Sequence, residues 1–118
     1  MQKLNLTVRE MCEILEAEPV GVSAAVFRRK VKLCLDSRQV EKGCVFWPIC
    51  GERFDAHQFV EQAQNEGAIM SVVNENKVSQ NTIQAYVPVK DTVDSFADII
   101  DGKYVQIQTV FVLNVEKI

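Results

Sequence analysis

Histidine is nearly absent from this sequence, and its cysteines lack a metal-binding spacing. The chain contains one histidine, His57, and four cysteines at positions 12, 34, 44 and 50. No Cys-x-x-Cys pair occurs, whereas structural zinc sites are built from cysteines and histidines at short spacings. We therefore expect no metal site, and we interpret the cysteines as reduced residues of a core or pocket.

Long apolar runs and an excess of positive charge are also missing. No segment approaches the roughly 20 apolar residues that cross a membrane, and the first residues lead into no signal-peptide core. The formal net charge is −3 and the isoelectric point is near 5.1, with basic residues grouped only at 28–32. These features predict a soluble cytoplasmic protein that binds neither membrane nor nucleic acid.

What is present is the pattern of a single α/β domain. The chain has 118 residues and is 47% hydrophobic, which is enough for one domain with a proper core. Apolar strand patterns alternate with helical ones, and this alternation predicts a small mixed or mostly parallel sheet flanked by helices. We expect helices at about 7–17, at 55–66 and after Asp91, and strands at about 31–35, 45–49, 68–73 and 85–89.

Local signals mark the ends of these elements. Thr7-Val8-Arg9-Glu10 has the form of a capping box. Asp55 and Asp91 are placed to cap the later helices, and Gly67 is a stop signal. Trp47, inside the second predicted strand, is expected to be buried.

Two polar segments follow neighbouring predicted strands. The first is Leu35-Asp36-Ser37-Arg38, and the second is Gly51-Glu52-Arg53-Phe54-Asp55-Ala56-His57. Ligands of α/β sheets bind beyond the carboxyl ends of the strands. The two segments therefore predict one ligand site, to which hydroxyl, guanidinium and backbone N–H groups contribute.

The same segments resemble the amino-terminal domain of the Mur ligases, ATP-dependent enzymes that build the peptide of the bacterial cell-wall precursor. The family pattern is Asp-(Ser/Thr)-Arg, a turn with glycine, an apolar strand ending in glycine, Glu-Arg-Phe-Asp-(Gly/Ala)-His and Gly-Ala. Here these motifs are Asp36-Ser37-Arg38, the stretch 43–51, the stretch 52–57 and Gly67-Ala68. The similarity covers about residues 1–100, and Ala56 favours the D-alanyl-D-alanine-adding branch over the diaminopimelate-adding and lysine-adding branches.

The resemblance implies that residues 1–103 form a nucleotide-sugar-binding domain for the uridine diphosphate (UDP) end of the UDP-MurNAc-peptide substrate. Ser37 would bond a uracil edge or a phosphate oxygen, unless its hydroxyl only forms a turn. Leu35 and Phe54 would be apolar walls, although Leu35 also suits the core. Arg53 would bind the diphosphate by forked hydrogen bonds, or remain a solvated surface residue. The implied substrate-binding residues are Leu35, Ser37, Gly51, Glu52, Arg53 and Phe54.

Four further residues are expected to support this site. Asp36 and Arg38 would hold the loop that carries Asp55. His57 lies in the first turn of its helix, where a protonated imidazole is disfavoured, so we expect a neutral hydrogen-bonding residue. We assign it no catalytic role, because no serine, cysteine or second acid lies near it in the motif.

Two departures from the family pattern limit the expected activity. Trp47-Pro48-Ile49-Cys50 replaces a Val-Ala-Leu-Lys stretch, so a lysine before Gly51 is missing. No glycine follows Gly102, and a phosphate-binding loop requires glycines and a lysine. ATP and magnesium are implied for the full-length family enzyme, which activates a carboxylate as an acyl phosphate for attack by an amine. This chain alone is expected to bind neither and to be inactive.

The last segment, 104–118, is β-prone and diverges where the family's ATP-binding domain would begin. We expect residues 104–115 to form a strand that pairs within the chain or across a homodimer. The alternative function is a non-catalytic module that associates with itself or with a partner. Binding of UDP would distinguish the two functions.

Overall fold

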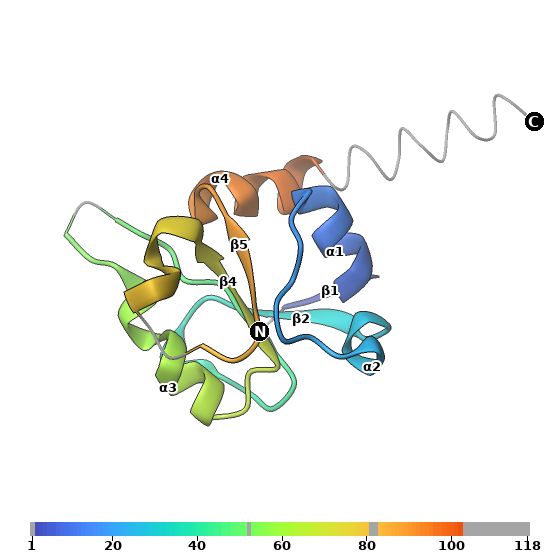
Figure 1. Cartoon of the computed structure of the whole chain (residues 1–118), viewed down its shortest axis with the longest axis horizontal. Coiled ribbons are helices and arrows are strands. Elements are labelled where there is room, and N and C mark those ends of the chain that lie inside the picture. The colour runs from blue at the N-terminus through green and yellow to red at the C-terminus, as the bar shows by residue number, and fades with distance from the viewer. Residues whose placement is uncertain (1, 52, 81–82, 103–118) are drawn as a thin grey trace, which may run out of the picture.

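The computed structural model describes residues 2–51, 53–80 and 83–102, which form a five-stranded sheet with its helices (Figure 1). The strand order follows the chain, from β1 to β5. β1 is antiparallel to β2, and the other neighbouring pairs are parallel. The predicted α/β fold with a mixed, mostly parallel sheet is confirmed. The strands are β1 (Gln2–Thr7), β2 (Lys30–Cys34), β3 (Val45–Phe46), β4 (Met70–Asn74) and β5 (Tyr86–Val89).

In the described residues, α-helices and several short turns lie between the strands and after β5. The helices are α1 (Val8–Leu15), α2 (Ala24–Phe27), α3 (Val60–Asn65) and α4 (Thr92–Ala97). Three 3₁₀ turns cover Ser37–Gln39, Ala56–Phe59 and Glu75–Gln80, and a π-helical turn, Asp98–Gly102, continues α4. Among the described helices, none has the length and apolar character needed to cross a membrane.

The sheet separates two apolar clusters, with α1 and α4 on one side of the strands and α3 on the other (Figure 1). Successive residues of a strand point to opposite faces, so in β4 Val72 joins the first cluster and Val73 the second. Met11 of α1 packs in the first cluster, and Val60 of α3 packs in the second. Because both faces are covered, the central strands are apolar nearly throughout.

The amino-terminal strand is the main element that sequence reasoning missed. We expected the chain to begin with a helix at 7–17, but β1 precedes α1 and pairs with β2. Leu4 and Leu6 are buried and alternate with exposed Asn5. This period-two signal is short, and only pairing with β2 identifies it as a strand. Helix α2, capped by Ser23, was also not predicted.

The second predicted strand, 45–49, is shorter in the structure. The ladder of β3 ends at Phe46, because Pro48 has no N–H group to donate. Trp47 still donates its backbone N–H to the Cys34 carbonyl at 2.9 Å. Its side chain is 0% exposed, and its indole N–H donates to the Thr92 carbonyl at 2.8 Å. The predicted burial of Trp47 is confirmed, and it ties β3 to α4.

The predicted helix caps are present. The Glu10 N–H donates to the Thr7 hydroxyl at 3.2 Å, and the Thr7 N–H donates to the Glu10 carboxylate at 2.9 Å, which completes the capping box. Asp91 accepts from two N–H groups at the start of α4. Asp55 caps a 3₁₀ turn, not the α-helix predicted for 55–66, and α3 begins only at Val60.

Two predicted features lie outside the described residues. Glu52, one of the expected ligand residues, is among them. So is the segment 104–115, for which we expected a strand.

Candidate functional site

The two predicted ligand segments meet in one pocket of about 640 Å³. It lies beyond the carboxyl ends of β2 and β3, where ligands of α/β sheets bind. Leu35, Asp36, Ser37 and Arg38 come from the end of β2, and Phe54 comes from the loop after β3. Ala56, Phe59 and Gln62 complete the lining. The structure therefore brings together residues from both segments.

The apolar wall of this pocket is formed by exposed side chains. β2 ends at Cys34, so Leu35 does not continue the buried alternation predicted for the strand, and it is 41% exposed. Phe54 is 56% exposed, and its ring centroid lies 5.8 Å from that of Phe59. Phe59 is half-buried: it packs against the second apolar cluster and also lines the pocket. A flat ligand ring can pack on such a surface.

The polar wall contains a local ion pair. Asp36 accepts from the Arg38 backbone N–H at 2.9 Å, from Nε at 3.1 Å and from Nη2 at 2.9 Å. These bonds lower the pKa of Asp36 below its usual value. We expected this pair to hold the loop that carries Asp55. The structure instead pairs Asp36 with Arg38, and the lysine bound to Asp55 is Lys77.

Ser37 is a polar group of the pocket whose hydroxyl has hydrogen-bonding capacity to spare. It opens the first 3₁₀ turn and is 8% exposed. Among the described residues, no hydrogen bond to its hydroxyl is found. A serine hydroxyl can both donate and accept, so this group is available to a ligand.

Gly51 and Arg53 belong to an exposed loop beside the pocket and do not line it. The loop is closed at its base, where the Gly51 N–H donates to the Phe54 carbonyl at 2.6 Å and Cys50 forms an isolated bridge with Asp55. Arg53 therefore stands next to a pocket wall residue, Phe54, with its own side chain in solvent.

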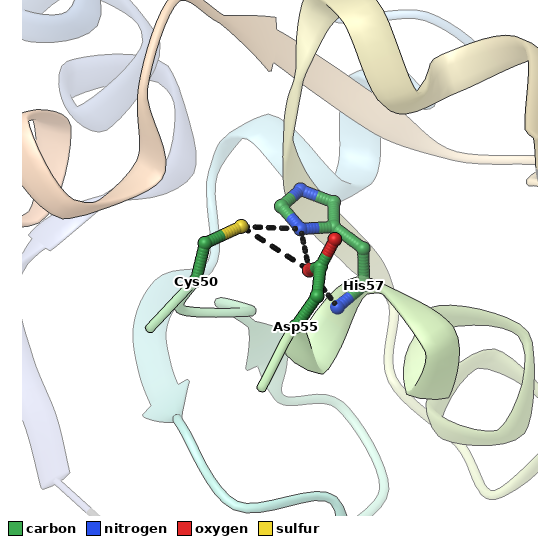
Figure 2. Close-up of side chains that lie close together, drawn as sticks. All are labelled: Cys50, Asp55 and His57. Atoms are coloured by element: carbon green, nitrogen blue, oxygen red, sulfur yellow. Dashed lines mark hydrogen bonds and ion pairs between the residues drawn. The ribbon is translucent and has the colours of Figure 1, made fainter. Parts of the chain in front are cut away.

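Cys50, Asp55 and His57 form a cluster at the base of this loop (Figure 2). The thiol of Cys50 lies 3.1 Å from Asp55 Oδ1 and 3.3 Å from His57 Nδ1. The motif itself offers His57 no cysteine, but the fold brings the thiol of Cys50, from outside the motif, next to it. The Cys50–Asp55 bridge that closes the loop creates the contact, and the sequence shows no signal of it.

The hydrogen bonds of His57 define its protonation state. The Asn74 backbone N–H donates to Nε2 at 2.9 Å, so Nε2 carries no proton. Nδ1 lies 2.7 Å from Asp55 Oδ1 and must therefore be the donor. The geometry is that of a neutral imidazole, 2% exposed, with both ring nitrogens in use.

This cluster is not arranged as a nucleophile and its base. Cys50 faces Nδ1, the nitrogen that carries the proton, so His57 cannot accept the thiol proton there. Burial, followed by the hydrogen bond to Asp55, raises the pKa of Cys50 to about 11. The sulfur stays a thiol at neutral pH, whereas the thiolate is the reactive form.

The same atoms are a poor cation site, although one ligand atom from each residue lies within 4.8 Å of the others. A metal ion bound to His57 Nδ1 would displace the proton that this nitrogen shares with Asp55. The other ring nitrogen, Nε2, already accepts a hydrogen bond from the Asn74 N–H. The Lys77 ammonium lies 2.8 Å from Asp55 Oδ2 and would repel a cation. Cys50, Asp55 and His57 are therefore better suited to a hydrogen-bond network than to a metal site.

Asp55 is expected to make folding sensitive to acid. Burial opposes its ionisation, but hydrogen bonds from Lys77, from the backbone N–H of His57, from Cys50 and from the His57 ring outweigh this and hold its pKa well below the usual range. Because the pKa of Asp55 is lower in the folded than in the unfolded chain, its ionised carboxylate stabilises the fold. This stabilisation is fully present above the unfolded-state pKa of about 3.9 and is lost as the pH falls below it. In urea unfolding, the free energy of unfolding of wild type should therefore exceed that of Asp55→Asn at neutral pH, and the difference should shrink below about pH 4.

Glu18→Gln, which removes an exposed carboxylate, is the control for this pH series. The difference in free energy of unfolding between Glu18→Gln and wild type is expected to change little over the same pH range. Parallel curves for wild type and Asp55→Asn between pH 6 and 2 would contradict the prediction.

Comparison with known families gives an independent assignment. A family model described as "Mur ligase family, catalytic domain" matches residues 32–104. The UDP-N-acetylmuramoyl-tripeptide–D-alanyl-D-alanine ligase of Haemophilus influenzae is 32% identical over 89 residues, which cover 75% of this chain and 18% of the relative. The corresponding Escherichia coli enzyme is 34% identical over 65 residues, covering 55% of this chain and 14% of its own length. The chain thus spans less than a fifth of these relatives.

Solved structures agree with the sequence comparison. MurF from Acinetobacter baumannii superposes with a TM-score of 0.62 at 25% identity, covering 80% of this chain and 20% of that protein. A second structure of a D-alanyl-D-alanyl ligase from the same organism gives a TM-score of 0.60 at 24% identity and supports the fold, with the same coverage of 80% and 20%. The resemblance seen in the motifs is confirmed, and the chain belongs to the Mur ligase family of ATP-dependent peptide ligases.

Proposed function

We propose that this chain binds the UDP end of a UDP-MurNAc-peptide for the D-alanyl-D-alanine-adding reaction of peptidoglycan precursor synthesis. The observation that carries the proposal is the single pocket joining the Leu35–Arg38 segment to Phe54. Two relatives, from Haemophilus influenzae and Escherichia coli, are named as ligases of a UDP-N-acetylmuramoyl-tripeptide and D-alanyl-D-alanine. That name supports a uridine nucleotide sugar as the ligand.

The proposed roles follow from the pocket walls. Leu35, Phe54 and Phe59 offer an apolar surface on which the uridine ring packs. Ser37 bonds a uracil edge or a phosphate oxygen. Arg53, exposed on the adjoining loop, reaches the diphosphate with forked hydrogen bonds.

The proposed role is binding and not catalysis. Cys50 is a protonated thiol and His57 has both ring nitrogens occupied by Asp55 and Asn74. Neither group can act on a substrate from this arrangement. ATP and magnesium are proposed to be bound by other parts of the family enzymes.

Titration with UDP tests this proposal. We expect saturable chemical-shift changes with a dissociation constant on the order of 0.1–1 mM, equivalent to roughly 4–5.5 kcal/mol. The shifted amides should be those of residues 35–38 and the loop around Arg53 and Phe54. Ser37→Ala should weaken binding by about 0.5–1.5 kcal/mol, and Arg53→Ala by about 1.5–3 kcal/mol because its contact is charged.

Arg28→Ala is the matched control for Arg53→Ala, because Arg28 is also exposed but follows α2. This variant should bind UDP as wild type does. ATP should give no saturable shifts. Changes that cluster away from the pocket, or equal losses in both arginine variants, would overturn the site assignment.

A further inference from the structure

One carboxylate holds both ends of the loop that carries Phe54. Asp55 Oδ1 accepts from the Cys50 thiol, which precedes the loop, at 3.1 Å. It also accepts from the His57 backbone N–H at 2.9 Å and bonds Nδ1 at 2.7 Å, after the loop. Figure 2 shows Cys50 and His57 converging on this carboxylate. The position of Asp55 therefore fixes the base of the loop.

The second oxygen of Asp55 is held from another part of the fold. Lys77, in the 3₁₀ turn Glu75–Gln80 after β4, places its ammonium 2.8 Å from Asp55 Oδ2. The side chains of Lys77 and Asp55 are 30% and 34% exposed, so this pair is partly shielded from solvent. Shielded pairs are screened less by salt and water than fully exposed ones.

Asn74, at the end of β4, adds a second anchor. Its backbone N–H donates to His57 Nε2 at 2.9 Å, and its side-chain oxygen accepts from the Thr92 N–H at 2.7 Å. Asp55 and His57 are thus tied to β4 and to the start of α4. With the Asn74 contacts intact, removal of Lys77 would leave the cluster folded but would free one oxygen of Asp55.

Phe54 connects this network to the pocket. It directly precedes Asp55, and its carbonyl accepts the Gly51 N–H at 2.6 Å. Its side chain lines the pocket, whereas Lys77 does not. A shift of Asp55 would therefore move a pocket wall, and the ion pair with Asp55 gives Lys77 a route to a ligand in the pocket.

We infer that Lys77 is a positioning residue for the ligand pocket, and that its ion pair with Asp55 holds Phe54 in the pocket wall. The ligand used to test this inference, UDP, rests on the proposed function. The positioning itself does not, because it is a property of the free chain. Lys77 lies in a segment that the sequence presents only as a polar loop.

UDP titration of Lys77→Met gives the first test. The dissociation constant should rise about 3–10-fold, which is less than the loss of a direct charged hydrogen bond would give, because Lys77 acts on the ligand indirectly. Lys77→Arg should recover affinity to within about twofold of wild type, since a guanidinium can also bond the carboxylate.

Lys42→Met is the control for lost charge. Lys42 is exposed and lines a basic pocket with Arg29, Lys30 and Lys32, so this variant should bind as wild type does.

A double-mutant cycle separates positioning from direct attraction to the anionic ligand. If Lys77 acts through Phe54, then Lys77→Met should have little further effect in a Phe54→Ala background. An undiminished loss in that background, or an equal loss in Lys42→Met, would overturn the inference.

The free chain gives a readout that does not depend on the ligand. The amide shifts of Gly51, Arg53 and Phe54 should move in Lys77→Met and stay in place in Lys42→Met. If wild type failed to bind UDP, the proposed function would fail while these shifts still tested the positioning. If the amide chemical shifts of the loop did not change in Lys77→Met, the inference would be wrong, whatever the result of the UDP titration.

Discussion

Replacement of Trp47 by alanine is expected to lower the free energy of unfolding by about 3–5 kcal/mol. The side chain is 0% exposed and packs edge-on against Phe96, with ring centroids 5.8 Å apart. The indole N–H also satisfies the Thr92 carbonyl at 2.8 Å. Removal would leave a large cavity between β3 and α4 and would break this hydrogen bond. A domain of ordinary stability, about 5–15 kcal/mol, would lose a large share of it.

Urea unfolding followed by circular dichroism measures this loss. Trp47→Phe keeps much of the volume but removes the hydrogen bond to the Thr92 carbonyl, and it should cost about 1–3 kcal/mol. Phe54→Ala removes an aromatic ring that is 56% exposed and should cost less than about 1 kcal/mol. Similar costs for Trp47→Ala and Phe54→Ala would contradict the structural role assigned to Trp47.

Gly21→Ala is expected to destabilise the fold by about 2–4 kcal/mol. Gly21 has φ +70, where a side chain is strained, and a Cβ built there would overlap the carbonyl oxygen of Gln84. That oxygen belongs to the main chain and cannot rotate away alone. Val20 and Tyr86 exchange two backbone hydrogen bonds, at 2.7 and 3.0 Å, which hold this segment against β5. The clash can therefore be relieved only by separating paired backbone.

Gly51→Ala is the matched control for this stability measurement. Gly51 does not have a positive φ, and the nearest atom to a Cβ built there is the Phe54 carbonyl oxygen at 3.6 Å, an ordinary contact. Its unfolding free energy should change by less than about 1 kcal/mol. If thermal or urea unfolding gave equal losses for the two variants, the close approach at Gly21 would not be the cause.

The departure from the family pattern before Gly51 has a structural consequence. The pattern places a lysine there, and this chain has Cys50, whose thiol contacts Asp55 at 3.1 Å. The ammonium beside Asp55 in this chain is that of Lys77, at 2.8 Å, from the turn after β4.

The sequence by itself determined the α/β class, the helix caps and the family, because each depends on residues close together in the chain. Capping boxes and strand alternation are local patterns. The pocket was also foreseen in part: Leu35, Ser37 and Phe54 lie where the ends of neighbouring strands were expected to meet.

Only the tertiary structure decided which side chains touch across those ends. β1 became recognisable through its pairing with β2. His57 and Asn74 are separated by 17 positions, and Asn74 and Thr92 by 18, yet each pair is hydrogen-bonded. The contact between Lys77 and Asp55 likewise depends on how β4 and its following turn pack beside the loop. Such contacts leave no periodic signal in the sequence, because packing of distant elements, and not local conformation, creates them.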